Sequence, residues 1–136
     1  MKILLDAMGG DNAPDATIKG AVDAIDEIKA ELVLIGQEAV ITSKVKEFYG
    51  KSLSEINPRL SVVNAREKIE MEDKPTEAIR QKKDSSMVVG FNMLKEGKGD
   101  VFISAGNSGA LLTGATLLVG RIKGIDRPAL AGVLPA

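Results

Sequence analysis

Cysteine and histidine are both missing from the 136 residues of this sequence. Without cysteine there are no disulfides, thiolate nucleophiles or cysteine-bound metals, which is compatible with a reducing cytoplasm. Without histidine the sequence lacks the most common general base and the most common transition-metal ligand. Catalysis by these residues would therefore use backbone amides, hydroxyls, side-chain amides, carboxylates, Lys and Arg, and we expect no metal and no cofactor.

Aromatic residues and excess charge are scarce as well. The sequence has three Phe, one Tyr and no Trp, and its 18 basic and 19 acidic residues nearly cancel. Proteins that bind nucleic acid present basic surfaces, often with aromatic side chains on which bases stack. We therefore expect no nucleic-acid partner.

Long hydrophobic runs are missing too. The opening apolar run is interrupted by Asp6 and is too short for the core of a signal peptide. The uncharged stretch at residues 105–120 contains Asn107, Ser108 and several glycines, and it is shorter than the roughly 20 apolar residues that span a bilayer. We interpret it as a buried core helix.

The segments that are present alternate between apolar stretches of strand length and amphipathic stretches of helix length. This alternation predicts an α/β fold with a mostly parallel sheet. Helices are expected after Pro14, before Gly50, after Pro75, after Ser85 and at residues 110–119, and strands at residues 3–5, 32–35, 60–63, 101–103 and 129–134.

The expected strand at residues 129–134 has no helix after it. Parallel sheets are normally covered by helices on both faces. We therefore expect residues 1–136 to form a single α/β domain that is the amino-terminal part of a longer enzyme.

A first glycine-rich loop joins the expected first strand to the first helix. In open α/β sheets, ligands bind at the carboxyl ends of strands. Gly9 and Gly10 would let backbone amides approach a ligand, and the following helix start favours an anion, although Asp6 and Asp11 oppose one. A tight turn in which the acids cap amides is the alternative, and the local pattern leaves both open.

A second loop has the same placement with fewer acids, and it contains Gly106, Asn107, Ser108 and Gly109. Amides at the start of the following helix, together with the Asn107 and Ser108 side chains, would hold a phosphate or polarise a carbonyl. The alternative is that the glycines permit a turn and close packing while Asn107 or Ser108 caps the helix.

A third candidate combines Lys82 and Lys83 with the expected helix start at Ser85 and Ser86. Cations and free amides together attract anions. The alternative is a solvated basic helix end, which is the more frequent role of such charge runs. Arg127, which precedes Pro128, is a weaker fourth candidate.

Two nucleotide-binding motifs are missing from the sequence. It has neither the GxxxxGK[ST] phosphate loop nor a GxGxxG pattern after the first strand. A nucleotide-linked oxidoreductase and a non-catalytic binding module nevertheless stay open as alternative functions.

Four blocks of the sequence resemble, in order and spacing, the PlsX family of bacterial phosphate acyltransferases: ILLDAMGGDNAP, IEMEDKPTEAIRQKKDSSM, VFISAGNSGALLTGA and DRPALAGVLP. The resemblance implies a three-layer α/β/α fold similar to isocitrate and isopropylmalate dehydrogenases. It also implies a cytoplasmic homodimer attached peripherally to the inner face of the cell membrane. The implied reaction, a step of phospholipid synthesis, moves a fatty acyl group from acyl carrier protein to inorganic phosphate, and a membrane-bound acyltransferase uses the acyl phosphate.

The resemblance also marks candidate residues in each block. Asn107 and Ser108 are the expected catalytic pair, with roles that we infer from their chemistry. The expected phosphate or substrate contacts are Gly9, Gly10, Asp11, Asn12, Lys82, Lys83, Ser85, Ser86, Gly106, Gly109 and Arg127.

Overall fold

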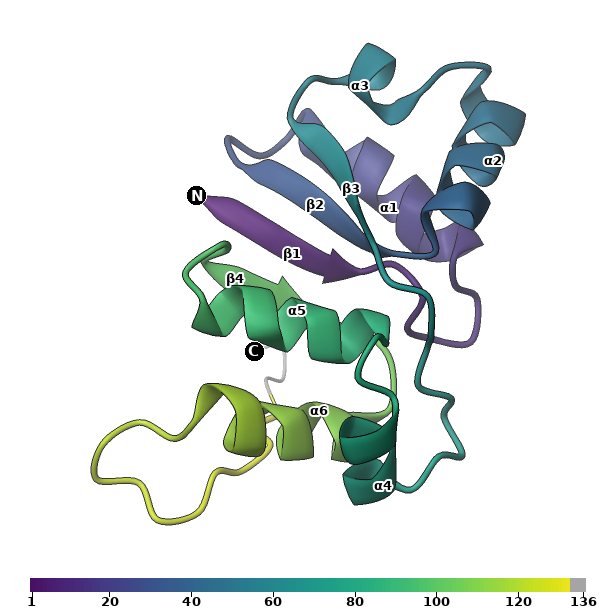
Figure 1. Cartoon of the computed structure of the whole chain (residues 1–136). Coiled ribbons are helices and arrows are strands. Elements are labelled where there is room, and N and C mark those ends of the chain that lie inside the picture. The colour runs from purple at the N-terminus through teal and green to yellow at the C-terminus, as the bar shows by residue number, and fades with distance from the viewer. Residues whose placement is uncertain (133–136) are drawn as a thin grey trace.

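The computed structural model describes residues 1–132 and contains four strands separated by helices (Figure 1). The strands are β1 (Lys2–Asp6), β2 (Glu31–Gly36), β3 (Leu60–Asn64) and β4 (Val101–Ile103). The helices are α1 (Asp15–Ile25), α2 (Glu38–Tyr49), α3 (Leu53–Ile56), α4 (Pro75–Gln81), α5 (Ser86–Lys95) and α6 (Ser108–Gly114), which continues as the π-helix η1 (Ala115–Val119).

The four described strands are all parallel and lie in the order β3-β2-β1-β4. The chain moves outward from β1 to β3 and then returns through α4 and α5 to place β4 on the other side of β1. The strand order therefore reverses between β1 and β4. Ligands of open α/β sheets bind at the carboxyl ends of strands at this kind of reversal.

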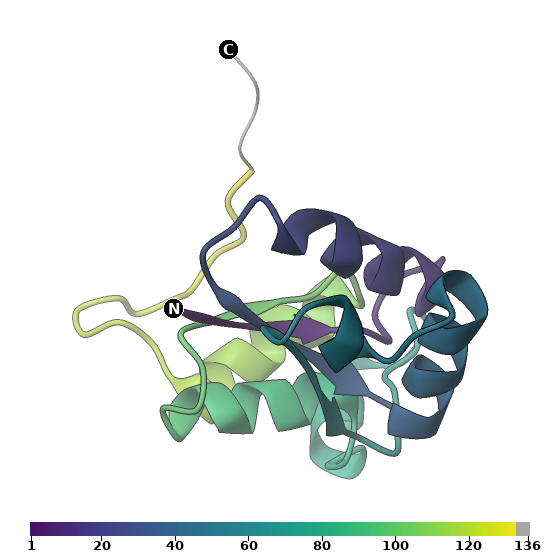
Figure 2. The ribbon, with the colours of Figure 1, turned by 90° about the horizontal axis from the view of Figure 1, so that it is seen from above.

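Helices lie on both faces of the sheet (Figure 2). Successive side chains of a strand point to opposite faces. Leu32 and Leu34 accordingly pack with α1, α2 and α3, whereas Leu4, Val33 and Ile35 pack with α5. The predicted α/β fold with a parallel sheet flanked by helices is thus confirmed.

Local signals set several of the element boundaries. Gly50 ends α2 in the left-handed conformation, at φ 69°, which glycine adopts without steric cost. Ser85 begins α5 by accepting a hydrogen bond from the amide of Val88 at 3.2 Å. These two boundaries lie where the sequence predicts them.

The short helix α3 was not predicted. Ser52 caps it by accepting a hydrogen bond from the Glu55 amide, and its hydroxyl also donates to the Glu55 carboxylate at 3.0 Å. Ser and Glu three residues apart form a capping pair that marks a helix start. The signal was therefore present, although the helix contains only four residues.

The helix predicted at residues 110–119 is present as α6 and η1, but the prediction that it is buried is wrong for most of its length. Only Ala110 and Gly114 are buried, and Leu117 is 63 % exposed. One side of this helix packs against α4 and α5, whereas Leu117 and Val119 on its other side are exposed. No helix in this part of the chain is long and apolar enough to cross a membrane.

The predicted strand at residues 129–134 is wrong for residues 129–132, and residues 133 and 134 lie outside the described part. Residues 129–132 are exposed and pair with no described strand. A strand needs a neighbouring strand to satisfy its backbone hydrogen bonds. The apolar composition of this segment therefore does not suffice to form one.

Candidate functional site at the carboxyl edge of the sheet

Asp6 ends β1 and joins the ends of three elements. Its Oδ1 accepts hydrogen bonds from the Ser86 hydroxyl at 2.6 Å and from the Met8 amide at 3.1 Å. Its Oδ2 accepts one from the hydroxyl of Ser104, which directly follows β4, at 2.8 Å. The carboxylate thus connects the first loop, the start of α5 and the second loop.

The two glycine-rich loops lie against each other at this point. A Cβ atom at Gly9 would lie 2.6 Å from Asp6 Oδ2 and 3.0 Å from the amide nitrogen of Gly106. Gly10, at φ 113°, faces Ala105. Only glycine at position 9 permits this approach, so the two glycine-rich loops form one surface.

Asn107 has a structural role that the sequence analysis left as an alternative. Its Oδ1 accepts a hydrogen bond from the Ala110 amide at 3.1 Å and so caps α6. Its Nδ2 donates to the backbone carbonyls of Glu70, Met71 and Asp73, the last at 2.9 Å. Asn107 therefore holds the loop before α4 against the start of α6.

Lys82 holds the same loop from its other side. Its Nζ lies 2.6 Å from the carboxylate of Asp73 and 3.0 Å from the carbonyl of Lys68. The hydrogen bond from Lys82, with a second from the amide of Glu70, lowers the pKa of the Asp73 carboxyl below its ordinary value. The charge of Lys82 is thus balanced within the protein.

Gly109 lets α6 approach α4. A Cβ atom at this position would lie 2.6 Å from Cγ of Pro75, the first residue of α4. The close-packing alternative for this glycine therefore matches the geometry.

The remaining predicted residues fall into three places. Ser85 and Ser86 are buried, and their hydroxyls bind the Val88 amide and Asp6. Lys83 lies at a groove beside Arg80 and η1, and Arg127 lies at another beside Pro128 and α6. The exposed residues beside the glycine loops are Asp11, Asn12 and Ser108.

Asp6 accepts the Met8 amide, as the alternative of an acid that caps an amide proposed, but the sequence did not predict its hydrogen bonds with Ser86 and Ser104. Asp6 is the last residue of β1 and Ser104 directly follows β4, and this position at the carboxyl end of a strand is the signal that could have found them. Their pairing depends on β4 lying beside β1, which no local pattern specifies.

The surface formed by the two loops is suited to a small anion. The first amides of a helix have no partner within it. Within residues 1–132, no protein acceptor pairs with the amides of Ser108 and Gly109. These donors lie beside the glycine loops at the edge where the strand order reverses, where an anion would find hydrogen bonds and the positive end of a helix. No group of three or more carboxylates in this part of the chain is arranged to hold a metal ion.

Fold and site together define a parallel α/β protein with a candidate anion site between its first and fourth strands. The chain belongs to the family of fatty acid synthesis proteins, whose profile matches residues 1–136. It is 53 % identical over 136 residues to the phosphate acyltransferase of Acetivibrio thermocellus, covering 99 % of this chain and 39 % of that protein. It is also 52 % identical over 135 residues to the phosphate acyltransferase of Clostridioides difficile, covering 99 % of this chain and 38 % of that protein. The chain thus spans about two fifths of the length of these relatives.

Proposed function

We propose that this chain acts as the amino-terminal part of a longer phosphate acyltransferase. The enzyme would transfer a fatty acyl group from acyl carrier protein to inorganic phosphate and so supply acyl phosphate for phospholipid synthesis. The family match, and relatives that carry this name at about 50 % identity, support the proposal.

The observation that carries the proposal is the contact between the two glycine loops at the reversal of the strand order. Gly9 and Gly106 lie side by side there, and the free amides of Ser108 and Gly109 follow in the same turn. We assign the phosphate to this surface, with Asn107 and Ser108 lining the reaction centre. In this assignment Ser108 contacts the anion, and Asn107 acts by fixing the turn.

The chemistry of the reaction suits such a site. The second pKa of inorganic phosphate lies near neutrality, so a substantial fraction is a dianion at neutral pH and needs no deprotonation before it attacks a thioester. The thiolate leaving group, with a pKa of roughly 8.5, needs little protonation. The enzyme must therefore supply position, compensation of the phosphate charge, and donors for the developing oxyanion. Backbone amides and hydroxyls meet these needs, so direct transfer without an acyl-enzyme is the simplest mechanism.

The other candidate residues have more distant roles in this proposal. Lys83 and Arg127 are cations on the rims of separate grooves, where they would draw the acidic carrier protein or phosphate toward the enzyme. Lys82 would act indirectly by holding Asp73 and the loop that Asn107 also binds.

The larger assembly is proposed on the same basis. The complete protein would have the three-layer fold of isocitrate and isopropylmalate dehydrogenases, form a homodimer, and work at the inner face of the cell membrane. A parallel sheet with helices on both faces is consistent with that fold.

A chimera tests the proposal. Residues 1–136 would replace the matching segment of the Acetivibrio thermocellus enzyme, and acyl phosphate would be measured with acyl carrier thioester and labelled phosphate. We expect the rate of acyl phosphate formation to rise with the phosphate concentration. A folded chimera that forms none, while the unaltered relative does, would contradict the proposal.

A further inference from the structure

The carboxylate of Asp6 is buried without a cation. The residue is only 2 % exposed, and within residues 1–132 no Lys or Arg forms an ion pair with it. A charge buried in this way is costly unless other groups compensate it. The charge of Asp6 must therefore be compensated by neighbouring hydrogen-bond donors.

Three hydrogen-bond donors take the place of a cation. The Ser86 hydroxyl and the Met8 amide donate to Oδ1, and the Ser104 hydroxyl donates to Oδ2. Because Ser104 gives its proton to Asp6, its oxygen is free to accept the amide of Gly106, at 3.1 Å. Asp6 therefore fixes the orientation of Ser104 and, through it, the turn that contains Gly106.

The packing around Gly9 links this chain of hydrogen bonds to the other loop. The Cβ position of Gly9 lies 2.6 Å from Asp6 Oδ2 and 3.0 Å from the Gly106 nitrogen. The carboxylate and both loops are thus in mutual contact. A shift of Asp6 or Ser104 would move the two loops relative to each other.

We propose that Asp6 is a positioning residue that acts through Ser104 to hold the two glycine loops at the spacing that phosphate requires. This inference rests on the proposed function. Asp6 touches no substrate in this proposal, because it is buried and both of its oxygens accept hydrogen bonds from the protein. A purely structural Asp6 would affect stability alone.

The test compares variants of the chimera that lose hydrogen bonds next to the glycine loops with a control variant that loses them at the other edge of the sheet. Ser104→Ala removes the hydroxyl, Asp6→Asn changes the carboxylate, and Ser104→Thr keeps a hydroxyl. The control is Arg59→Ala, which removes hydrogen bonds to the carbonyls of Ile25, Ile28 and Ala30 at the opposite, amino-terminal edge of the sheet.

We expect Ser104→Ala to lower kcat/KM for phosphate by about tenfold to hundredfold, the scale of a small misplacement at a reaction centre. The thioester KM should change much less, and Ser104→Thr should restore most of the loss. Asp6→Asn should resemble Ser104→Ala if it folds. Arg59→Ala should lower the thermal midpoint at least as much, with turnover per folded molecule unchanged.

Two results would overturn the inference. One is an equal loss of turnover in Ser104→Ala and Arg59→Ala at matched thermal midpoints, and the other is normal phosphate kinetics in Ser104→Ala. Calorimetric titration with inorganic phosphate separates this inference from the proposed function. If the chimera is inactive but still binds phosphate, the proposed function fails, and a lower phosphate affinity in Ser104→Ala than in Arg59→Ala would still support the role of Asp6. A chimera that neither reacts nor binds phosphate would overturn both proposals.

Discussion

The side-chain amide of Asn107 is fully engaged by the protein itself. Its oxygen caps α6, and its nitrogen donates to three carbonyls of the loop before α4. An amide with these partners has no donor left for an oxyanion unless the loop moves. At the scale of single residues, Asn107 is therefore a residue that shapes the site.

Asn107→Ala should mainly reduce stability. Loss of the cap costs about 1 kcal/mol, and loss of the loop contacts costs a similar amount. Asn107→Asp keeps the capping oxygen but turns a second acceptor toward the three carbonyls, so it should also destabilise the protein. Thermal melting and initial rates of the chimera provide the measurement. A roughly hundredfold loss of turnover without loss of stability would instead show that the amide acts on the substrate.

The ion pair between Lys82 and Asp73 predicts a pH dependence. The pKa of Asp73 lies below its ordinary value of 3.8 in the folded protein, so the pair contributes its full stability above that value. The contribution is lost as the pH falls through the lowered pKa. The stability difference between the unaltered chimera and its Lys82→Gln variant should therefore be constant at neutral pH and shrink below about pH 4.

Denaturation midpoints of the unaltered chimera and of Lys82→Gln, measured at a series of decreasing pH values, test this expectation. Lys98→Gln is a suitable control because the ion pair between Lys98 and Glu96 is largely exposed, and exposed pairs contribute little. A constant difference for Lys82→Gln through the acid range would show that the pair does not stabilise the fold.

At the scale of elements, the spacing of α4 and α6 depends on Gly109. An alanine there would place its Cβ 2.6 Å from the Pro75 ring and would push the two helices apart. We expect Gly109→Ala to destabilise the protein by about 1–3 kcal/mol. Gly20→Ala, on the exposed surface of α1 with no atom within 4 Å, should stabilise it by about 0.4–1 kcal/mol. Equal effects of both substitutions on thermal midpoints would contradict the packing argument.

Most elements could be predicted because their causes are local. Apolar spacing, Gly50 and the Ser85 cap are visible in the sequence, and the helices and strands follow them. The site could be predicted only in outline. The sequence places both glycine loops at the correct edge of the sheet, where strands end. The hydrogen bonds of Asp6 with Ser86 and Ser104 depend on the strand order, which is set by long-range packing. The strand prediction for residues 129–132 was wrong for the same reason, because a strand must pair with another strand that lies elsewhere in the sequence.

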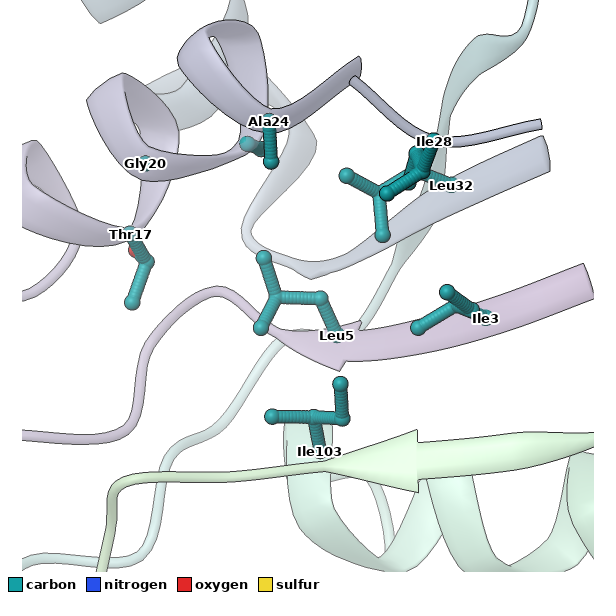
Figure 3. Close-up of a pocket in the computed structure, with 9 residues that line it drawn as sticks. Ile3, Leu5, Thr17, Gly20, Ala24, Ile28, Leu32 and Ile103 are labelled. Carbon is teal, nitrogen blue, oxygen red and sulfur yellow. The ribbon is translucent and has the colours of Figure 1, made fainter. Parts of the chain in front are cut away.

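At the scale of the whole molecule, β4 leaves one side of the sheet open. Val101 and Ile103 are 39 % and 48 % exposed. Figure 3 shows the side chains of Leu5 and Ile103 directed toward α1 across an apolar groove, which Ile3 and Ile28 also line. Exposed apolar surface next to an unpaired strand edge favours association.

Residues 1–136 expressed alone should therefore self-associate and should not catalyse acyl transfer. Ile103→Lys should reduce the association, because it places a charge at the open strand. Leu130→Lys, which alters an exposed apolar residue that does not line this groove, should have less effect. Sedimentation velocity would measure the difference, and a clean monomer that turns over like the chimera would contradict the expectation.

The account as a whole depends on phosphate binding where the two glycine loops meet, and Ser108→Asp tests this most directly. An acid is well tolerated in the first turn of a helix, but here its charge would repel phosphate. The control is Ser54→Asp, which adds the same charge to the first turn of α3. Initial rates of the chimera over a range of phosphate concentrations should show a phosphate KM raised at least about tenfold in Ser108→Asp, since charge-assisted contacts contribute about 1.5–3 kcal/mol. Its thioester KM should stay nearly unchanged, and Ser54→Asp should behave like the unaltered chimera. An unchanged phosphate KM in a folded Ser108→Asp enzyme would contradict the account.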